Sequence, residues 1–174
     1  MSLTVSLVAP SLAATHAVAA TVAACCRQGD IVVLAGDMGA GKTAFAQGFG
    51  RALGVAEPIT SPTFTLVQSY ATPRGQFHHA DVYRLDQLHE VADLALGELA
   101  EFRGIVLVEW GDVVAAALGE HLEVRLDLAG DPDLESLADE PRRVTITPSG
   151  RSWAQRWSTL VERLGALDLD AAAG

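Results

Sequence analysis

The stretch from Gly36 to Thr43 carries residue types and a spacing that can bind phosphate. It reads Gly36-Asp37-Met38-Gly39-Ala40-Gly41-Lys42-Thr43 and fits the pattern G-x-x-x-x-G-K-[ST]. Glycines let backbone N–H groups converge on phosphate oxygens, and a helix that follows adds the positive end of its dipole. Lys42 is the only lysine among the 12 basic residues, so arginine supplies every other positive charge. These residues, with Ala44 next to them, predict a nucleotide-binding loop.

Two acids end strand-like runs elsewhere in the chain. Asp81 follows Gln76 to Ala80, and Glu109 follows the apolar run Ile105-Val106-Leu107-Val108. Proteins with a phosphate-binding loop place magnesium or the attacking water near an acid at such a strand end. Lys42, Asp81 and Glu109 are therefore the candidate catalytic residues.

Both acids have simpler interpretations, which the sequence leaves open. Glu109 can be a structural carboxylate, and Asp81 can belong to a surface hydrogen-bond network with His79 or Arg84. The adjacent His78 and His79 have no third ligand nearby at zinc spacing, so we do not predict a zinc site.

Three further residues are candidates for contact with the nucleotide. Pro62 favours an extended backbone at Ser61, so Ser61-Pro62-Thr63 forms either an ordinary turn or a loop that senses the terminal phosphate. Trp110 either stacks on the nucleotide or belongs to the core or an interface. We include Ser61, Thr63 and Trp110 in the predicted cofactor-binding set.

The elements around the loop are those its chemistry needs. Ile31 to Ala35 is a short, β-branched apolar run that predicts a buried strand. Apolar residues recur at helical spacing from Phe45 to Leu53, and Gly54 is a helix stop. A strand at Leu3–Leu7 and a helix at Ser11–Arg27 precede them. Strand, helix, strand, loop and helix in this order indicate an α/β fold.

The remaining pattern completes a single predicted domain over residues 1–165. Strands are expected at 64–70, 76–82, 104–108, 122–128 and 142–147, and helices at 86–103, 113–118 and 153–164. We expect a P-loop NTPase-like three-layer sandwich with a mainly parallel, partly mixed central sheet. The acidic segment 130–141 is expected to be a mobile loop, and residues 166–174 a flexible tail.

The composition limits the kinds of partner and the cellular compartment that we expect for this chain. The net charge of −10 argues against binding DNA or bulk RNA through a basic field. Cys25 and Cys26 are adjacent and cannot join distant segments, which favours a reduced, cytoplasmic protein. Residues 1–30 lack a basic start, and no run of about 20 apolar residues occurs, so neither a signal peptide nor a membrane span is expected.

Four blocks in fixed order give the chain a family resemblance. They are Gly36–Thr43, Ser61-Pro62-Thr63-Phe64-Thr65-Leu66-Val67 with Tyr70, His79-x-Asp81-x-Tyr83-Arg84-Leu85, and Glu109-Trp110. This order resembles the TsaE (YjeE) family, bacterial ATPases required to form threonylcarbamoyladenosine (t6A) at position 37 of tRNAs. The resemblance is dense over residues 30–112. Met38 stands where the family more often has leucine, and segment 130–141 and the tail match nothing in the family.

The resemblance implies ATP and magnesium as cofactors. Lys42 and the loop amides would hold phosphates, Thr43 and Glu109 would hold magnesium, and Asp81 would position or deprotonate the attacking water. Ser61 and Thr63 would form the nucleotide-sensing loop. The implied partners are the TsaB and TsaD proteins, with tRNA reached only through that complex, which ATP hydrolysis would drive or reset.

Other classes of nucleotide-binding protein fit less well. A small-molecule kinase usually adds a lid rich in arginine, and no such insertion is visible. A GTPase needs an Asn/Thr-Lys-x-Asp segment, whereas this chain has no asparagine and uses its one lysine in the loop. A scaffold that binds nucleotide without hydrolysis stays open as an alternative.

Overall fold

The computed structural model describes residues 3–62, 64–83, 95–130 and 140–170. Within these residues, seven strands form one sheet in the order β1-β7-β6-β2-β5-β4-β3. The strands are β1 (Val5–Ala9), β2 (Ile31–Ala35), β3 (Val67–Thr72), β4 (Gly75–Asp81), β5 (Gly104–Glu109), β6 (His121–Leu128) and β7 (Arg142–Ser149). The central strands β6, β2, β5 and β4 pair in parallel, while β3, β7 and β1 join by antiparallel pairing.

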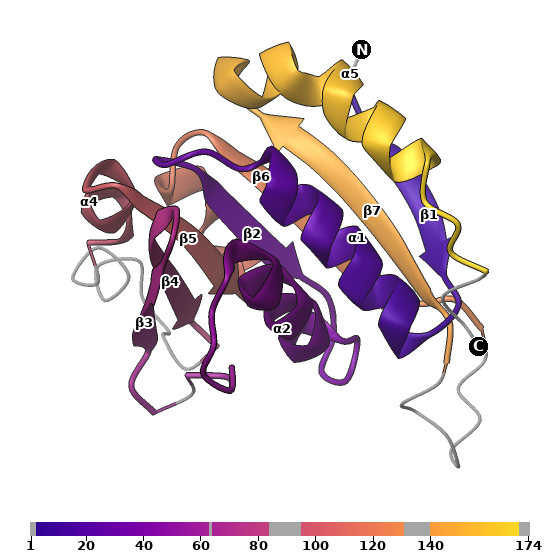
Figure 1. Cartoon of the computed structure of the whole chain (residues 1–174), viewed down its shortest axis with the longest axis horizontal. Coiled ribbons are helices and arrows are strands. Elements are labelled where there is room, and N and C mark those ends of the chain that lie inside the picture. The colour runs from indigo at the N-terminus through magenta and orange to yellow at the C-terminus, as the bar shows by residue number, and fades with distance from the viewer. Residues whose placement is uncertain (1–2, 63, 84–94, 131–139, 171–174) are drawn as a thin grey trace.

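Helices cover the sheet on both faces, which makes three layers (Figure 1). The helices α1 (Leu12–Cys25), α2 (Lys42–Leu53) and α5 (Arg151–Gly165) pack on one face. The short helix α4 (Leu96–Glu101) and the 3-10 turns η1 (Gly111–Val113) and η2 (Ala115–Ala117) lie toward the other face. The predicted α/β three-layer sandwich is confirmed.

The central strand β2 is buried along its whole length. Val32 and Leu34 point into the core under α1 and α2, whereas Ile31 and Val33 join the smaller cluster on the opposite face. A parallel strand covered on both faces needs apolar residues at every position, which explains the unbroken apolar run. This strand was predicted correctly at both ends.

Two predicted elements differ from the structure. The strand expected from Phe64 begins instead at Val67, because the carbonyl of Pro62 accepts a hydrogen bond from Leu66 N–H and Leu66 adopts a φ of 62°. The helix expected at 113–118 is two separate 3-10 turns, since Val114 leaves the helical conformation between them. Both errors come from short apolar runs, which do not reveal a backbone reversal.

Other predicted elements differ from the structure by a few residues at their ends, or lie partly outside the described residues. The first strand starts at Val5, and the helix predicted over 86–103 is described only from Leu96, because residues 84–94 lie outside the described ranges. Residues 131–139 of the predicted acidic loop and 171–174 of the predicted tail also lie outside them. Within the predicted tail, Leu167 and Leu169 are partly buried and pack against the core. No helix in the described ranges is long and apolar enough to cross a membrane.

Candidate functional site

The carboxyl ends of three parallel strands meet at one edge of the sheet. In the strand register, Glu109 of β5 stands opposite Leu34 of β2 on one side and Asp81 of β4 on the other. The Gly36–Thr43 loop follows directly after the last residue of β2, Ala35. The register therefore brings the two predicted acids together beside the loop, although 28 positions separate them in the sequence.

The loop is shaped by glycine and supported from a distant strand. Gly36 has a φ of 131°, and a Cβ there would collide with the carbonyl oxygen of Leu126 on β6. Arg142, at the start of β7, is buried and donates from Nε to the Ala40 carbonyl at 3.0 Å and from Nη2 to the Gly39 carbonyl at 3.4 Å. Arg142 therefore fixes the outer turn of the loop.

The start of α2 presents unused hydrogen-bond donors. Gly41 caps this helix with a φ of 103°, and no side chain caps it. Among the described residues, no backbone carbonyl accepts from the N–H groups of Gly41, Lys42 or Thr43. Donors of this kind at a helix start, together with the positive dipole end, bind anions.

Lys42 is buried at the centre of the site, with 5% of its surface exposed. Its Nζ donates to the carbonyl oxygens of Gly36 and Asp37, both at 2.7 Å, and lies 3.7 Å from the centroid of the Trp110 ring. Burial lowers the pKa of Lys42, and the charge of Glu109 opposes that shift. The ammonium thus rests on neutral groups, which a phosphate can replace.

Trp110 reaches this position through an unusual backbone. Its φ is 62°, in the left-handed region that a bulky residue seldom adopts. Its ring packs against the ring of Tyr83 with 4.8 Å between centroids. The aromatic pair forms a wall over Lys42, and the partly buried Trp110 also packs against the smaller core cluster.

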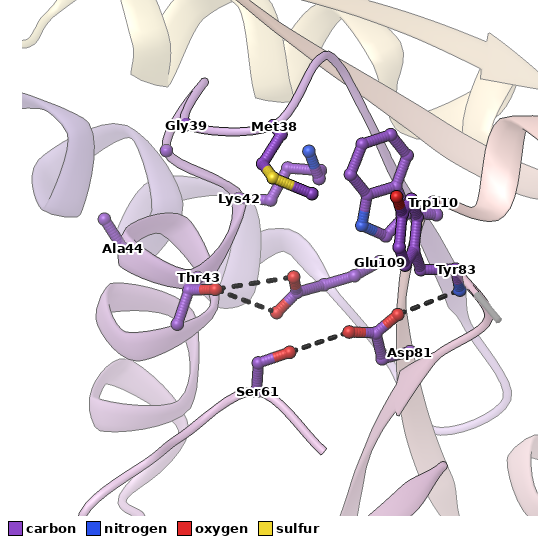
Figure 2. Close-up of a pocket in the computed structure, with 11 residues that line it drawn as sticks. Met38, Gly39, Lys42, Thr43, Ala44, Ser61, Asp81, Tyr83, Glu109 and Trp110 are labelled. Carbon is purple, nitrogen blue, oxygen red and sulfur yellow. Dashed lines mark hydrogen bonds between the residues drawn. The ribbon is translucent and has the colours of Figure 1, made fainter. Parts of the chain in front are cut away.

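The two acids have different surroundings, as Figure 2 shows. Thr43 Oγ1 lies 3.4 and 3.5 Å from the carboxylate oxygens of Glu109, while His79 Nε2 lies 2.8 Å from Glu109 Oε1. Because an ionised carboxylate only accepts, Nε2 of His79 carries the proton. His79 is fully buried and hydrogen-bonded to Glu109, so it does not place Asp81 in a surface network. Arg84, the other neighbour considered for Asp81, lies outside the described residues.

Asp81 is held by two donors. Its Oδ2 accepts from Ser61 Oγ at 2.8 Å, and its Oδ1 accepts from the backbone N–H of Tyr83 at 2.9 Å. Each oxygen retains a further lone pair. Ser61 thus contacts an acid of the site directly, which favours the functional interpretation of its loop over an ordinary turn.

These groups surround one cavity of about 410 Å³. It is lined by the predicted residues Met38, Gly39, Gly41, Lys42, Thr43, Ala44, Ser61, Asp81, Glu109 and Trp110, together with Tyr83. Three predicted residues do not line it. Gly36 and Ala40 are buried supports of the loop, and the exposed Asp37 borders a neighbouring cavity. Thr63 lies outside the described residues.

Sequence reasoning missed three members of the site. His79 had a usable signal, because it lies two residues before Asp81 on the same strand and so shares its face. Tyr83 stood in a block used for the family resemblance but received no role. Arg142 had no local signal, since only the fold brings it to a loop about 100 positions away.

The arrangement fits a nucleotide phosphate with a magnesium ion. Thr43 and Glu109 place a hydroxyl and a carboxylate together, which are ligand types that magnesium prefers. Among the described residues, no three His, Cys, Asp or Glu side chains gather into a ready-made metal cluster. Magnesium sites of this class use one or two protein oxygens and take the rest from substrate phosphates and water.

Comparisons with known proteins point to one family. The family model described as "Threonylcarbamoyl adenosine biosynthesis protein TsaE" matches residues 9–135. The chain is 36% identical over 155 residues to the tRNA threonylcarbamoyladenosine biosynthesis protein TsaE of Bacillus subtilis strain 168, covering 88% of this chain and 89% of that protein. The protein of the same name from Streptomyces coelicolor is 39% identical over 131 residues, covering 74% and 86%. The crystal structure of Bacillus subtilis YdiB superposes with a TM-score of 0.68 at 31% identity, covering 95% of this chain and 96% of YdiB.

Proposed function

The chain belongs to the TsaE family, and from that premise we propose that it is an ATPase of t6A formation at position 37 of tRNAs. The family model and the relatives carry the name of this pathway. The observation that supports hydrolysis is the pairing of Asp81 with Glu109 at adjacent strand ends, inside the cavity of the phosphate-binding loop.

Lys42, Thr43 and Glu109 form the nucleotide-holding part of the site. Lys42 Nζ and the free amides at the start of α2 bind the β- and γ-phosphates of ATP. Thr43 and Glu109 hold magnesium, which neutralises charge on the phosphates when bound. His79 fixes the rotamer of Glu109 through its 2.8 Å hydrogen bond.

Asp81 orients the attacking water. Its two hydrogen bonds, from Ser61 Oγ and Tyr83 N–H, fix the plane of the carboxylate and leave lone pairs toward the cavity. The nucleophile in phosphoryl transfer needs position more than it needs a strong base. Ser61 links this acid to the loop that precedes β3, so the loop is the nucleotide-sensing element of the proposal.

The proposed partners are TsaB and TsaD, in the cytoplasm, with tRNA reached through their complex. Large apolar side chains support a docking surface at the mouth of the site. Met38 and Tyr83 line the cavity and are 73% and 51% exposed. Exposed apolar groups around a cavity are typical of a protein interaction site. ATP hydrolysis then drives or resets the complex rather than modifying RNA directly.

Hydrolysis of ATP by the chain alone, and with TsaB and TsaD added, tests the proposal. We expect slow release of free phosphate from the chain alone and faster release in the complex. Lys42→Ala and Glu109→Ala should each lower turnover by about 100-fold or more, because both groups act on the charge of the transferring phosphate. Glu162→Ala, an exposed acid on α5, is the control and should keep parental turnover.

The same assay separates the two acids and the competing functions. Asp81→Asn should keep magnesium-dependent ATP binding and lose turnover, whereas Glu109→Ala should lose the magnesium dependence of binding. Parental hydrolysis in both variants would contradict the site assignment. Labelled phosphate on a small acceptor would support a kinase instead, and tight ATP binding without turnover in the full complex would support a scaffold.

A further inference from the structure

Residues where α1 ends and β2 begins line a second cavity. These segments lie at the opposite end of the sheet from the phosphate-binding loop (Figure 1). Its volume is about 310 Å³. Four of the chain's 11 arginines line it, namely Arg27, Arg74, Arg156 and Arg163. Such a concentration of positive charge stands out in a chain with a net charge of −10.

Arg156 is fully occupied by the fold. Its Nη1 donates to Asp30 Oδ2 at 2.7 Å and to the Cys25 carbonyl at 2.9 Å. Its Nη2 donates to Asp30 Oδ1 at 2.8 Å and to Ser152 Oγ at 2.9 Å, and its Nε donates to the Ser152 carbonyl at 3.1 Å. A guanidinium has five N–H donors, so none is left for a ligand. Asp30 also neutralises its charge.

Arg74 closes the end of α1 and keeps donors to spare. Its Nη1 donates to the Ala23 carbonyl at 2.9 Å, and its Nη2 donates to the Cys26 carbonyl. The carbonyls at a helix end carry the negative end of the dipole, which would repel an anion. Arg74 offsets that charge, and among the described residues three of its five N–H groups have no acceptor.

Arg27 and Arg163 supply charge that the fold does not use. Among the described residues, neither guanidinium has a hydrogen-bond or ion-pair partner. Arg163 lies on α5 one turn beyond Thr159, which also lines the cavity, so the two side chains share a helix face. The cavity therefore has two unpaired cations, a hydroxyl and the free donors of Arg74.

We propose that this cavity binds a compact oxyanion, the phosphate or diphosphate group of a small ligand, between Arg27, Arg74 and Arg163. Arginine forks match the geometry of phosphate oxygens and bind them through paired hydrogen bonds. The volume of this open cavity is large enough for a group of this size. An extended nucleic-acid strand fits less well, because the surrounding chain is acidic and would repel the neighbouring phosphates.

Cys25 offers a reporter inside this cavity. Cys25 is partly exposed and is one of the residues that line the cavity, whereas Cys26, the chain's other cysteine, is 1% exposed. Burial raises the pKa of Cys26 well above its usual value, so Cys26 stays an unreactive thiol. Modification of the folded chain by N-ethylmaleimide, an uncharged reagent, therefore measures access to Cys25.

The experiment follows the rate of this modification as pyrophosphate is added to the full chain at neutral pH. A bound diphosphate blocks access of the reagent to Cys25, so we expect about a tenfold slower reaction at saturation. Arg27→Ala combined with Arg163→Ala should raise the pyrophosphate concentration for half protection by about tenfold or more, because charge-assisted hydrogen bonds are lost. Both positions are exposed, so the double variant should fold.

Two controls locate the effect. Arg51→Ala with Arg143→Ala removes two exposed arginines outside the cavity and should leave protection unchanged. Lys42→Ala should also leave it unchanged, which separates this cavity from the phosphate-binding loop. The proposal is overturned by unprotected Cys25 in the parent, by equal protection in the Arg27/Arg163 variant, or by protection from a short single-stranded RNA but not from pyrophosphate.

Discussion

At the amino end of β2, the buried pair of Asp30 and Arg156 is joined by hydrogen bonds of 2.7 and 2.8 Å, whereas at the carboxyl end Thr43 reaches Glu109 only at 3.4 Å. The buried ammonium of Lys42 has no carboxylate within ion-pair distance among the described residues. One end of the strand thus carries a completed ion pair, and the other carries a buried ammonium that is held by neutral carbonyl groups and not by a counter-charge.

The difference separates two uses of buried charge. A buried ion pair stabilises a fold only if its hydrogen bonds are made, and the loss of one partner is then costly. A site that must bind a highly charged ligand needs buried charges that are not yet paired with each other. Charges that already form an ion pair would have to be separated before the ligand could bind. The contrast predicts that changes at the two ends affect stability with opposite signs.

The largest effect is expected at the completed pair. Asp30→Ala should lower the free energy of unfolding by about 3–5 kcal/mol, because it leaves the guanidinium of Arg156 buried without its counter-charge. Chemical denaturation at neutral pH measures this. Asp112→Ala is the matched control: it breaks the 3.5 Å pair with Arg125, which is partly exposed, and should cost no more than about 1 kcal/mol. Equal losses in the free energy of unfolding for the two variants would contradict the special role of the buried pair.

A gain in stability is expected at the opposite end. Lys42→Met should raise the free energy of unfolding of the ligand-free chain by about 1 kcal/mol at neutral pH, because methionine fills the space without a buried charge. Burial holds the folded pKa of Lys42 below its ordinary value of 10.5. The penalty is therefore full below the folded pKa and disappears as pH rises to 10.5, so the gain should shrink with pH.

Arg51→Met tests whether that gain is specific to the site. Arg51 is exposed on the same helix, so its replacement should change stability by less than about 0.5 kcal/mol at every pH. A loss of stability in Lys42→Met would show that the carbonyls of Gly36 and Asp37 and the Trp110 ring already satisfy the ammonium.

The smallest effect on stability is expected for a surface contact at the same end of the sheet as the Asp30–Arg156 pair. The carboxylate of Glu120 accepts hydrogen bonds from the N–H groups of Arg151 and Ser152, at 3.0 and 3.2 Å, and so caps α5. These bonds lower the pKa of Glu120 below its ordinary value of 4.5. The stabilisation is thus present above that value and is lost as pH falls through the lowered pKa.

Glu120→Gln should accordingly give a small fall in melting temperature at neutral pH, and the difference from the parent should vanish in acid, where both side chains are neutral. Glu162→Gln, an exposed acid later in α5, is the control and should show no such pH dependence. A difference that persisted in acid would point to lost packing against Gly150, the residue before α5, rather than to the charge.

Patterns that depend on neighbouring residues were predicted well. The apolar run at Ile31–Ala35, the glycine-rich loop and the helix that stops at Gly54 are all in place, because each is specified by local backbone preferences and burial. The failures are also local in cause. The left-handed φ of Leu66 and the break at Val114 occur at residues that carry no turn signal, so hydrophobic periodicity passed over them.

The sequence by itself determined that the chain has a phosphate-binding loop between a buried strand and a helix, and that its acids follow strands. The tertiary structure decided which groups meet. Only strand register sets Asp81 beside Glu109, and only the packing of β7 brings Arg142 to the loop. The gathering of arginines where α1 ends is likewise a property of the fold. The physical reason is that local preference acts over a few residues, whereas register and packing join segments far apart in the chain.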